Sequence, residues 1–153
     1  MVDAGLGPGI PPLNILLNIQ GHAAFEHGAA VNVTLWIIQG ALAAMFAFAG
    51  FLKATRPKKS LAEQMPWVED FSPGTIRLIG VLELAAALGL VLPAATGIAT
   101  VLTPLAATGL VVQMVLAAAT HLRRKELSNI AVNAVLLALA AFVAWGRFGP
   151  YSF

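Results

Sequence analysis

The sequence predicts an all-α integral membrane protein: a four-helix bundle with short loops and both termini on the same, external side. Composition is the first observation, because 59% of the 153 residues are hydrophobic and only 10% are charged, whereas soluble domains carry about 25% charged residues. The second observation is that four apolar runs each approach the roughly 20 residues that cross a bilayer. The third is that the basic residues gather beside these runs. The length fits one compact unit.

Residues 1–30 differ from the rest, and we expect an N-terminal extension that is irregular or lies on the membrane surface. Glycines and prolines between positions 5 and 12 break any early helix, and the apolar run Leu13–Ile19 is too short to cross a bilayer. A secretory signal begins with positive charge, but no Lys or Arg precedes Lys53. The alternative is that translation starts near Val31, since a GTG codon can initiate in bacteria; a native product containing Asp3 would refute it.

The four-helix domain covers residues 31–153, with helices expected at about 32–52, 75–92, 98–120 and 129–145. The first helix contains WIIQGALAAMFAFAGFL, and its small residues suit close helix packing in lipid. The second has Ser72 placed to cap it and Pro73 in its first turn, as helix starts prefer. Pro93 and Gly97 predict a tight turn into the third helix, and the polar stretch 121–128 separates the third helix from the fourth.

The loop between the first two helices has an amphipathic pattern of its own. Leu61, Met65, Val68 and Phe71 recur at helical spacing. This pattern predicts a short surface helix on the cytoplasmic leaflet, which Pro66 interrupts.

The basic residues predict the orientation. Two loops on one side of the membrane carry or adjoin eight of them: Lys53, Arg56, Lys58, Lys59, Arg77, Arg123, Arg124 and Lys125. The other side has only Arg147. Because Lys and Arg concentrate in cytoplasmic loops, we expect both termini outside the plasma (inner) membrane of a bacterium. Short basic clusters beside apolar runs suit phospholipid head groups, so we expect membrane lipids and no nucleic acid as partners.

Glu83 is the one charged residue within Leu78–Leu92. A charge at mid-membrane costs roughly 2.5–3.5 kcal/mol, so such residues usually face the bundle interior and mark function. A purely structural Glu83 would be protonated or paired with Lys53. Arg77 is a poorer partner, because a spacing of six residues leaves the two side chains on different faces of the helix.

The other three helices bring polar groups to a similar depth, which predicts a cytoplasm-facing pocket. Its candidate residues are Glu83, His121, Lys53, Gln113, Asn133 and Asn129, and no catalytic residue can be named. Gln113, Thr120 and His121 share one helix face, and the two asparagines form an i, i+4 pair. Structural alternatives exist for each: Lys53 snorkelling to the interface, His121 complementing a helix C-terminus, and amide hydrogen bonds between helices.

Four stretches in order, across Asn32–Phe148, resemble the DoxX family of small bacterial membrane proteins: AGFLKATRP, MPWVEDFSP, RLIGVLELAAALGLVLPAATG and ATHLRRKELSNIAVNAVLL. The resemblance implies a compact four-helix membrane bundle. Some relatives are associated with sulfur oxidation, quinone reduction or oxidant-defence complexes. The positions it emphasises are Lys53, Glu83, His121 and Asn133.

The first functional hypothesis is an accessory or quinone- or lipid-binding subunit of a membrane-associated redox system. His121 would donate a hydrogen bond to a quinone, Glu83 would relay protons, and Gln113 or Asn133 would orient the ring. Absence of cysteine excludes thiolate and iron–sulfur chemistry, and Glu83 is the only inward carboxylate, too few for a di-metal site. We therefore expect no covalent or metal-bound cofactor, with a quinone as the candidate ligand and a membrane or cytoplasmic redox protein as the electron source.

Two alternatives stay open. The chain could be a non-enzymatic scaffold whose basic loops dock another protein. A small-solute or proton pathway is less favoured, because no broken helix or inverted repeat is visible. Enzymatic activity and oligomeric state are left open.

Overall fold

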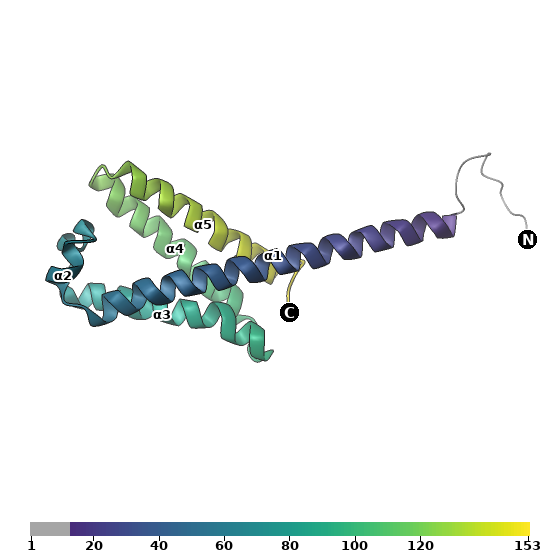
Figure 1. Ribbon diagram of the computed structural model, residues 1–153, viewed down its shortest axis with the longest axis horizontal. Coiled ribbons are helices and arrows are strands. Elements are labelled where there is room, and N and C mark those ends of the chain that lie inside the picture. The colour runs from purple at the N-terminus through teal and green to yellow at the C-terminus, as the bar shows by residue number, and fades with distance from the viewer. Residues whose placement is uncertain (1–12) are drawn as a thin grey trace, which may run out of the picture. The chain divides into compact units, whose positions relative to one another are not determined.

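The computed structural model describes residues 13–153. The order of elements is α1 (Leu13–Thr55), α2 (Lys58–Ala62), the 3-10 helix η1 (Pro66–Asp70), α3 (Pro73–Thr96), α4 (Leu102–Arg123) and α5 (Leu127–Phe148) (Figure 1). No strand occurs in this part of the chain. Contacts divide the chain into two units, residues 1–34 and 35–153.

Four helices are long and apolar enough to cross a membrane: Phe25–Thr55, Pro73–Thr96, Leu102–Arg123 and Leu127–Phe148. Their outward side chains are apolar, and Phe48, Leu88 and Leu116 are 68%, 58% and 63% exposed. Large exposed apolar surfaces are rare on soluble monomers. A membrane-spanning helical bundle, as predicted, fits both observations.

The N-terminal extension is helical where it is described. α1 begins at Leu13, so an irregular conformation of residues 13–30 is wrong, while residues 1–12 lie outside the described part. No proline interrupts Leu13–Thr55, and isolated glycines such as Gly21 and Gly28 cost a helix only about 1 kcal/mol each. A surface location for this segment stays a prediction.

The start of α3 is as predicted, but its end is not. Ser72 Oγ accepts a hydrogen bond from the Thr75 N–H at 3.1 Å, which caps the helix. The helix then continues through Pro93 to Thr96 and stops at Gly97, whose φ of +70° suits glycine. Membrane helices tolerate proline within their length. Near Pro93, Gln39 Nε2 of α1 donates to the Leu90 carbonyl at 2.8 Å, which ties the two helices together.

The crossing of α1 and α3 has two glycines in direct contact. A Cβ added to Gly80 would lie 2.7 Å from the Gly50 carbonyl oxygen and 2.7 Å from the Ala54 nitrogen. A Cβ added to Gly50 would lie 2.6 Å from the Gly80 carbonyl oxygen. Small residues allow such approach of membrane helices. The contact brings Lys53, three residues after Gly50, beside Glu83, three residues after Gly80.

The loop between α1 and α3 forms two short helices, α2 and η1, and η1 begins at Pro66. Its apolar face packs against the bundle rather than lying on a lipid leaflet as predicted. Leu61 and Val68 are 1% and 0% exposed and cluster with Leu52 and Ile76. The helical spacing correctly indicated an apolar face, but this face is buried against protein and not against lipid.

Candidate functional site

A cavity of about 550 Å³ lies between α1, α3, α4 and α5 and is also lined by η1. Five of the six predicted pocket residues line it: Lys53, Glu83, Gln113, His121 and Asn133. Its other walls are mainly apolar, including Phe46, Met114 and Leu136. The helices thus bring their polar groups to one cavity, at the end of the bundle where α1 and α4 finish and α3 and α5 begin; we call this the loop end.

Glu83 and Lys53 form a buried ion pair. Lys53 Nζ lies 2.7 Å from each Glu83 carboxylate oxygen, and the side chains are 8% and 3% exposed, lysine first. Gln113 Nε2 donates to Glu83 Oε1 at 2.7 Å. The Lys53 ammonium also lies 5.8 Å from the Trp67 ring centroid, within cation–π range. Of the two structural options for Glu83, the fold adopts pairing with Lys53.

A second polar cluster surrounds Glu126 in the turn between α4 and α5. His121 Nδ1 and Asn129 Nδ2 lie 2.6 and 2.9 Å from Glu126 Oε2, and Arg124 Nε donates to Oε1 at 2.7 Å. Arg124 also donates to Asp70 Oδ1 at 2.9 Å, which ties this turn to η1. His121 and Asn129 therefore bond Glu126 rather than Glu83, and Asn129 does not line the cavity.

Sequence reasoning missed Glu126 and Trp67. Glu126 lies in a polar loop, where a carboxylate usually faces solvent, and its signal was the spacing to His121 and Asn129. Trp67 follows Pro66 in a segment assigned to the membrane surface. Its ring lines the cavity and meets the His121 ring edge-on, with centroids 6.4 Å apart. Trp67 therefore connects the two polar clusters.

The hydrogen bonds of Glu126 predict how the stability of the fold changes with pH. Hydrogen bonds from Arg124, then Asn129 and His121, lower the pKa of Glu126 from 4.5 to about 2. A carboxyl with a depressed folded-state pKa stabilises the fold above its unfolded pKa and loses that contribution as pH falls through the folded pKa. The melting temperature of wild type should exceed that of Glu126→Gln at neutral pH. This difference in melting temperature should disappear as the pH falls from about 4.5 to 2. The exposed Glu63→Gln serves as control, and a pH-independent difference would contradict the prediction.

At the opposite end of the bundle, Arg147 is 3% exposed and organises the C-terminus. Its Nε donates to Gln39 Oε1 at 2.7 Å and one terminal nitrogen donates to the Tyr151 carbonyl at 2.8 Å. Its guanidinium lies 4.1 Å from the Phe153 ring centroid. The sequence predicts Arg147 on the outer side of the membrane but names no partner for it. This cluster holds the C-terminal residues and takes no part in the cavity.

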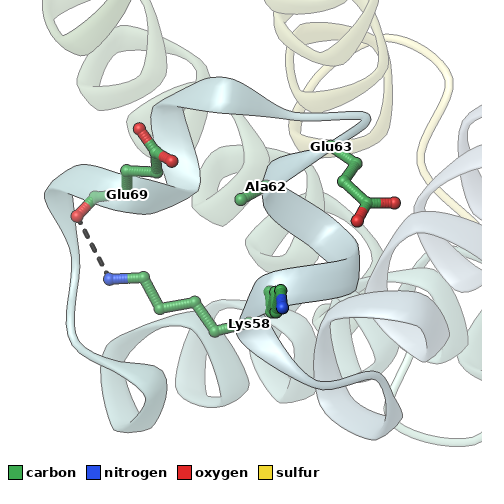
Figure 2. A pocket seen from close by; sticks show the side chains of 5 residues that line it. Lys58, Ala62, Glu63 and Glu69 are labelled. Atoms are coloured by element: carbon green, nitrogen blue, oxygen red, sulfur yellow. Dashed lines mark hydrogen bonds between the residues drawn. The ribbon is translucent and has the colours of Figure 1, made fainter.

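A second hollow, of about 580 Å³, lies beside α2 and η1 (Figure 2). Lys58 donates to the Glu69 carbonyl at 3.1 Å and to the Phe71 carbonyl at 2.7 Å. The remaining lining residues are Lys59, Ala62 and Glu63, and the charged ones are exposed. Exposed charges across an open surface hold a ligand weakly. The cavity lined by Glu83, with its buried polar groups, is therefore the candidate site.

Within residues 13–153, no group of three or more His, Asp or Glu side chains is placed to hold a metal ion. The polar groups that line the cavity include the Lys53 ammonium, the Gln113 and Asn133 amides, the His121 ring and the Glu83 carboxylate. Such groups can bind oxygen atoms and exchange protons.

Comparison with known proteins identifies the family of the chain. No curated protein and no solved structure matches the chain. The DoxX-like family matches residues 37–143, which include most of the four spans and every residue of the cavity named above. The chain therefore belongs to the DoxX-like family of integral membrane proteins.

Proposed function

We propose that this protein is an accessory subunit of a membrane-associated redox system and binds a quinone-like, lipid-soluble molecule in the cavity. The observation that carries the proposal is the two-part chemistry of the lining. Buried polar groups from all four long helices face mainly apolar walls. Small-molecule sites commonly have this composition: an apolar cavity of about 300–1,000 Å³ with a few placed polar groups.

The cavity also reaches the lipid-facing flank of the bundle. Met45 on α1 and Leu116 on α4 both line it, and they are 39% and 63% exposed. Both residues lie within membrane-spanning segments. A molecule dissolved in the acyl-chain region could therefore enter from the side. This route favours a lipid-soluble ligand over a water-soluble one.

The polar residues suit a ligand with ring oxygens that takes up protons when it is reduced. Lys53 and His121 can donate hydrogen bonds to such oxygens, and Glu83 can hold or release a proton. As part of the same proposal, we assign the supply of electrons to a partner redox protein in the membrane or the cytoplasm.

Decylubiquinone binding tests the proposal. Replacing Trp36 and Trp145 with Phe leaves Trp67, which lines the cavity, as the sole tryptophan among the three in the chain. Decylubiquinone should quench its fluorescence saturably in detergent. Ala117→Phe places a ring in the cavity while leaving Lys53 and Glu83 unsubstituted, and should weaken binding at least tenfold, about 1.4 kcal/mol.

The matched control is Ala138→Phe, because Ala138 is exposed on α5 and does not line the cavity. Its affinity for decylubiquinone should equal that of wild type. Linear, unsaturable quenching, or equal affinities for both phenylalanine variants, would reject a binding site in the cavity.

The second candidate function is a membrane scaffold. Exposed basic side chains surround the loop end, including Arg56, Lys59, Arg77, Arg123 and Lys125, and could dock an acidic surface of another protein. Two results together would favour the scaffold. The protein would capture a partner from native membranes and lose it when Lys59 and Lys125 are neutralised, and it would bind no quinone.

A further inference from the structure

The side-chain amide of Asn133 is buried, and its nitrogen has no hydrogen-bond partner among the residues that the structure describes. Asn133 lies on α5, is 8% exposed and lines the cavity. No residue that the structure describes accepts a hydrogen bond from Nδ2. Asn129, one turn earlier, instead donates to Glu126 at 2.9 Å. The cluster around Glu126 thus gives Asn129 a hydrogen-bond partner, whereas Asn133 lies at the cavity wall without one among the described residues.

An unpartnered amide at this position needs an explanation. A buried donor without a partner destabilises a fold, and inside a bilayer there is no bulk water to replace the missing partner. A leucine would fill the same space without that cost. An unsatisfied buried group in a native protein calls for an explanation, such as a functional role, and for Asn133 the adjacent cavity suggests one.

We propose that Asn133 orients the ligand, its amide donating a hydrogen bond to a neutral carbonyl or hydroxyl oxygen of the molecule in the cavity. This inference rests on the proposed function and specifies the ligand chemistry. A neutral oxygen fits better than an anion, because the buried cation of the lining, Lys53, is already paired with Glu83 at 2.7 Å. The other lining cation, Arg123, is exposed.

The proposed contact requires a rotation of the amide, because protein atoms cover Nδ2 in the conformation seen here. The nitrogen and oxygen of a terminal amide are nearly equal in shape, so a half-turn about χ2 exchanges their positions without moving α5. A ligand oxygen at the wall would favour the rotated form.

Asn133→Leu tests the inference through two measurements. The affinity for decylubiquinone, from Trp67 quenching, should fall roughly threefold to tenfold, the effect of one net hydrogen bond. The melting temperature without quinone should stay equal or rise, because an unpartnered donor is removed. Decanoate, an anion without ring oxygens, should bind more weakly than decylubiquinone and respond little to the substitution. Asn133→Ala is measured alongside, to separate loss of the amide from overpacking by leucine.

Thr103→Val is the matched control. Thr103 Oγ1 is likewise buried and has no hydrogen-bond partner among the described residues, but Thr103 does not line the cavity. Its replacement should leave decylubiquinone affinity unchanged, with an equal or higher melting temperature.

The outcomes separate this inference from the proposed function. Wild-type binding with equal affinity in both Asn133 variants overturns the role of Asn133 and leaves the proposed function standing. A lower melting temperature in both variants assigns Asn133 to packing and also overturns the inference. If decanoate binds more tightly than decylubiquinone and its binding depends on Asn133, the inference that the ligand oxygen is neutral is wrong. No saturable decylubiquinone binding by wild type rejects the proposed function as well.

Discussion

Lys53→Met is expected to destabilise the bundle by about 3–5 kcal/mol, because it leaves the Glu83 carboxylate buried without its cation. Lys53 Nζ bonds both oxygens of Glu83 at 2.7 Å, and both side chains are almost fully buried. Glu83→Gln, which strands the ammonium, should cost a similar amount. The measurement is the melting temperature of each variant in detergent.

The double variant Lys53→Met, Glu83→Gln provides the control. Replacing a buried ion pair with neutral residues of similar volume is often close to neutral in stability. The double variant should therefore be more stable than either single variant. If the cost of the double substitution equals the sum of the two single costs, the residues do not act as a pair. Neither result identifies a ligand, so stability and binding have to be measured separately.

Gly80→Ala is expected to have the next largest effect. Its Cβ would lie 2.7 Å from the backbone of α1 at both Gly50 and Ala54, and backbone atoms cannot move aside without separating the helices. Overpacking costs about 1–3 kcal/mol and sometimes more, whereas the gain in helix propensity is only about 1 kcal/mol. The net result should be a lower melting temperature and weaker decylubiquinone binding, since the crossing places Lys53 beside Glu83.

Gly109→Ala is the matched control, because a Cβ at Gly109 meets nothing within 4 Å. This variant should gain helix propensity and melt at an equal or higher temperature. Equal effects of the Gly80 and Gly109 substitutions would show that the α1–α3 backbones do not touch.

The convergence of the polar groups on one cavity could be predicted from the sequence. A helix rises 1.5 Å per residue, so counting from shared ends of the spans places Glu83, Gln113 and Asn133 at related depths. The repeat of the α-helix then determines which residues share one face of a helix. The pairing of Glu83 with Lys53 remained one of two options, because the choice depends on the approach of Gly50 to Gly80, which no local pattern reveals.

The cluster around Glu126 was harder to predict, because its only signal was the spacing to His121 and Asn129 and it depends on a turn that no glycine marks. Lys125 adopts a positive φ of 58°, and the Glu126 N–H then bonds the His121 carbonyl at 3.0 Å. This turn brings the Glu126 side chain back to His121. The burial of Leu61 and Val68 escaped prediction for a related reason: amphipathic spacing is the same for a helix that packs on protein and for one that lies on lipid.

Analysis of the small molecules retained after purification from native membranes tests the account most directly. Mass spectrometry of a solvent extract of the wild-type protein should detect a quinone-like molecule in near one-to-one amount, lost from Ala117→Phe and kept by Ala138→Phe. An extract that contains only phospholipid, in equal amounts from all three proteins, would contradict a quinone-binding cavity.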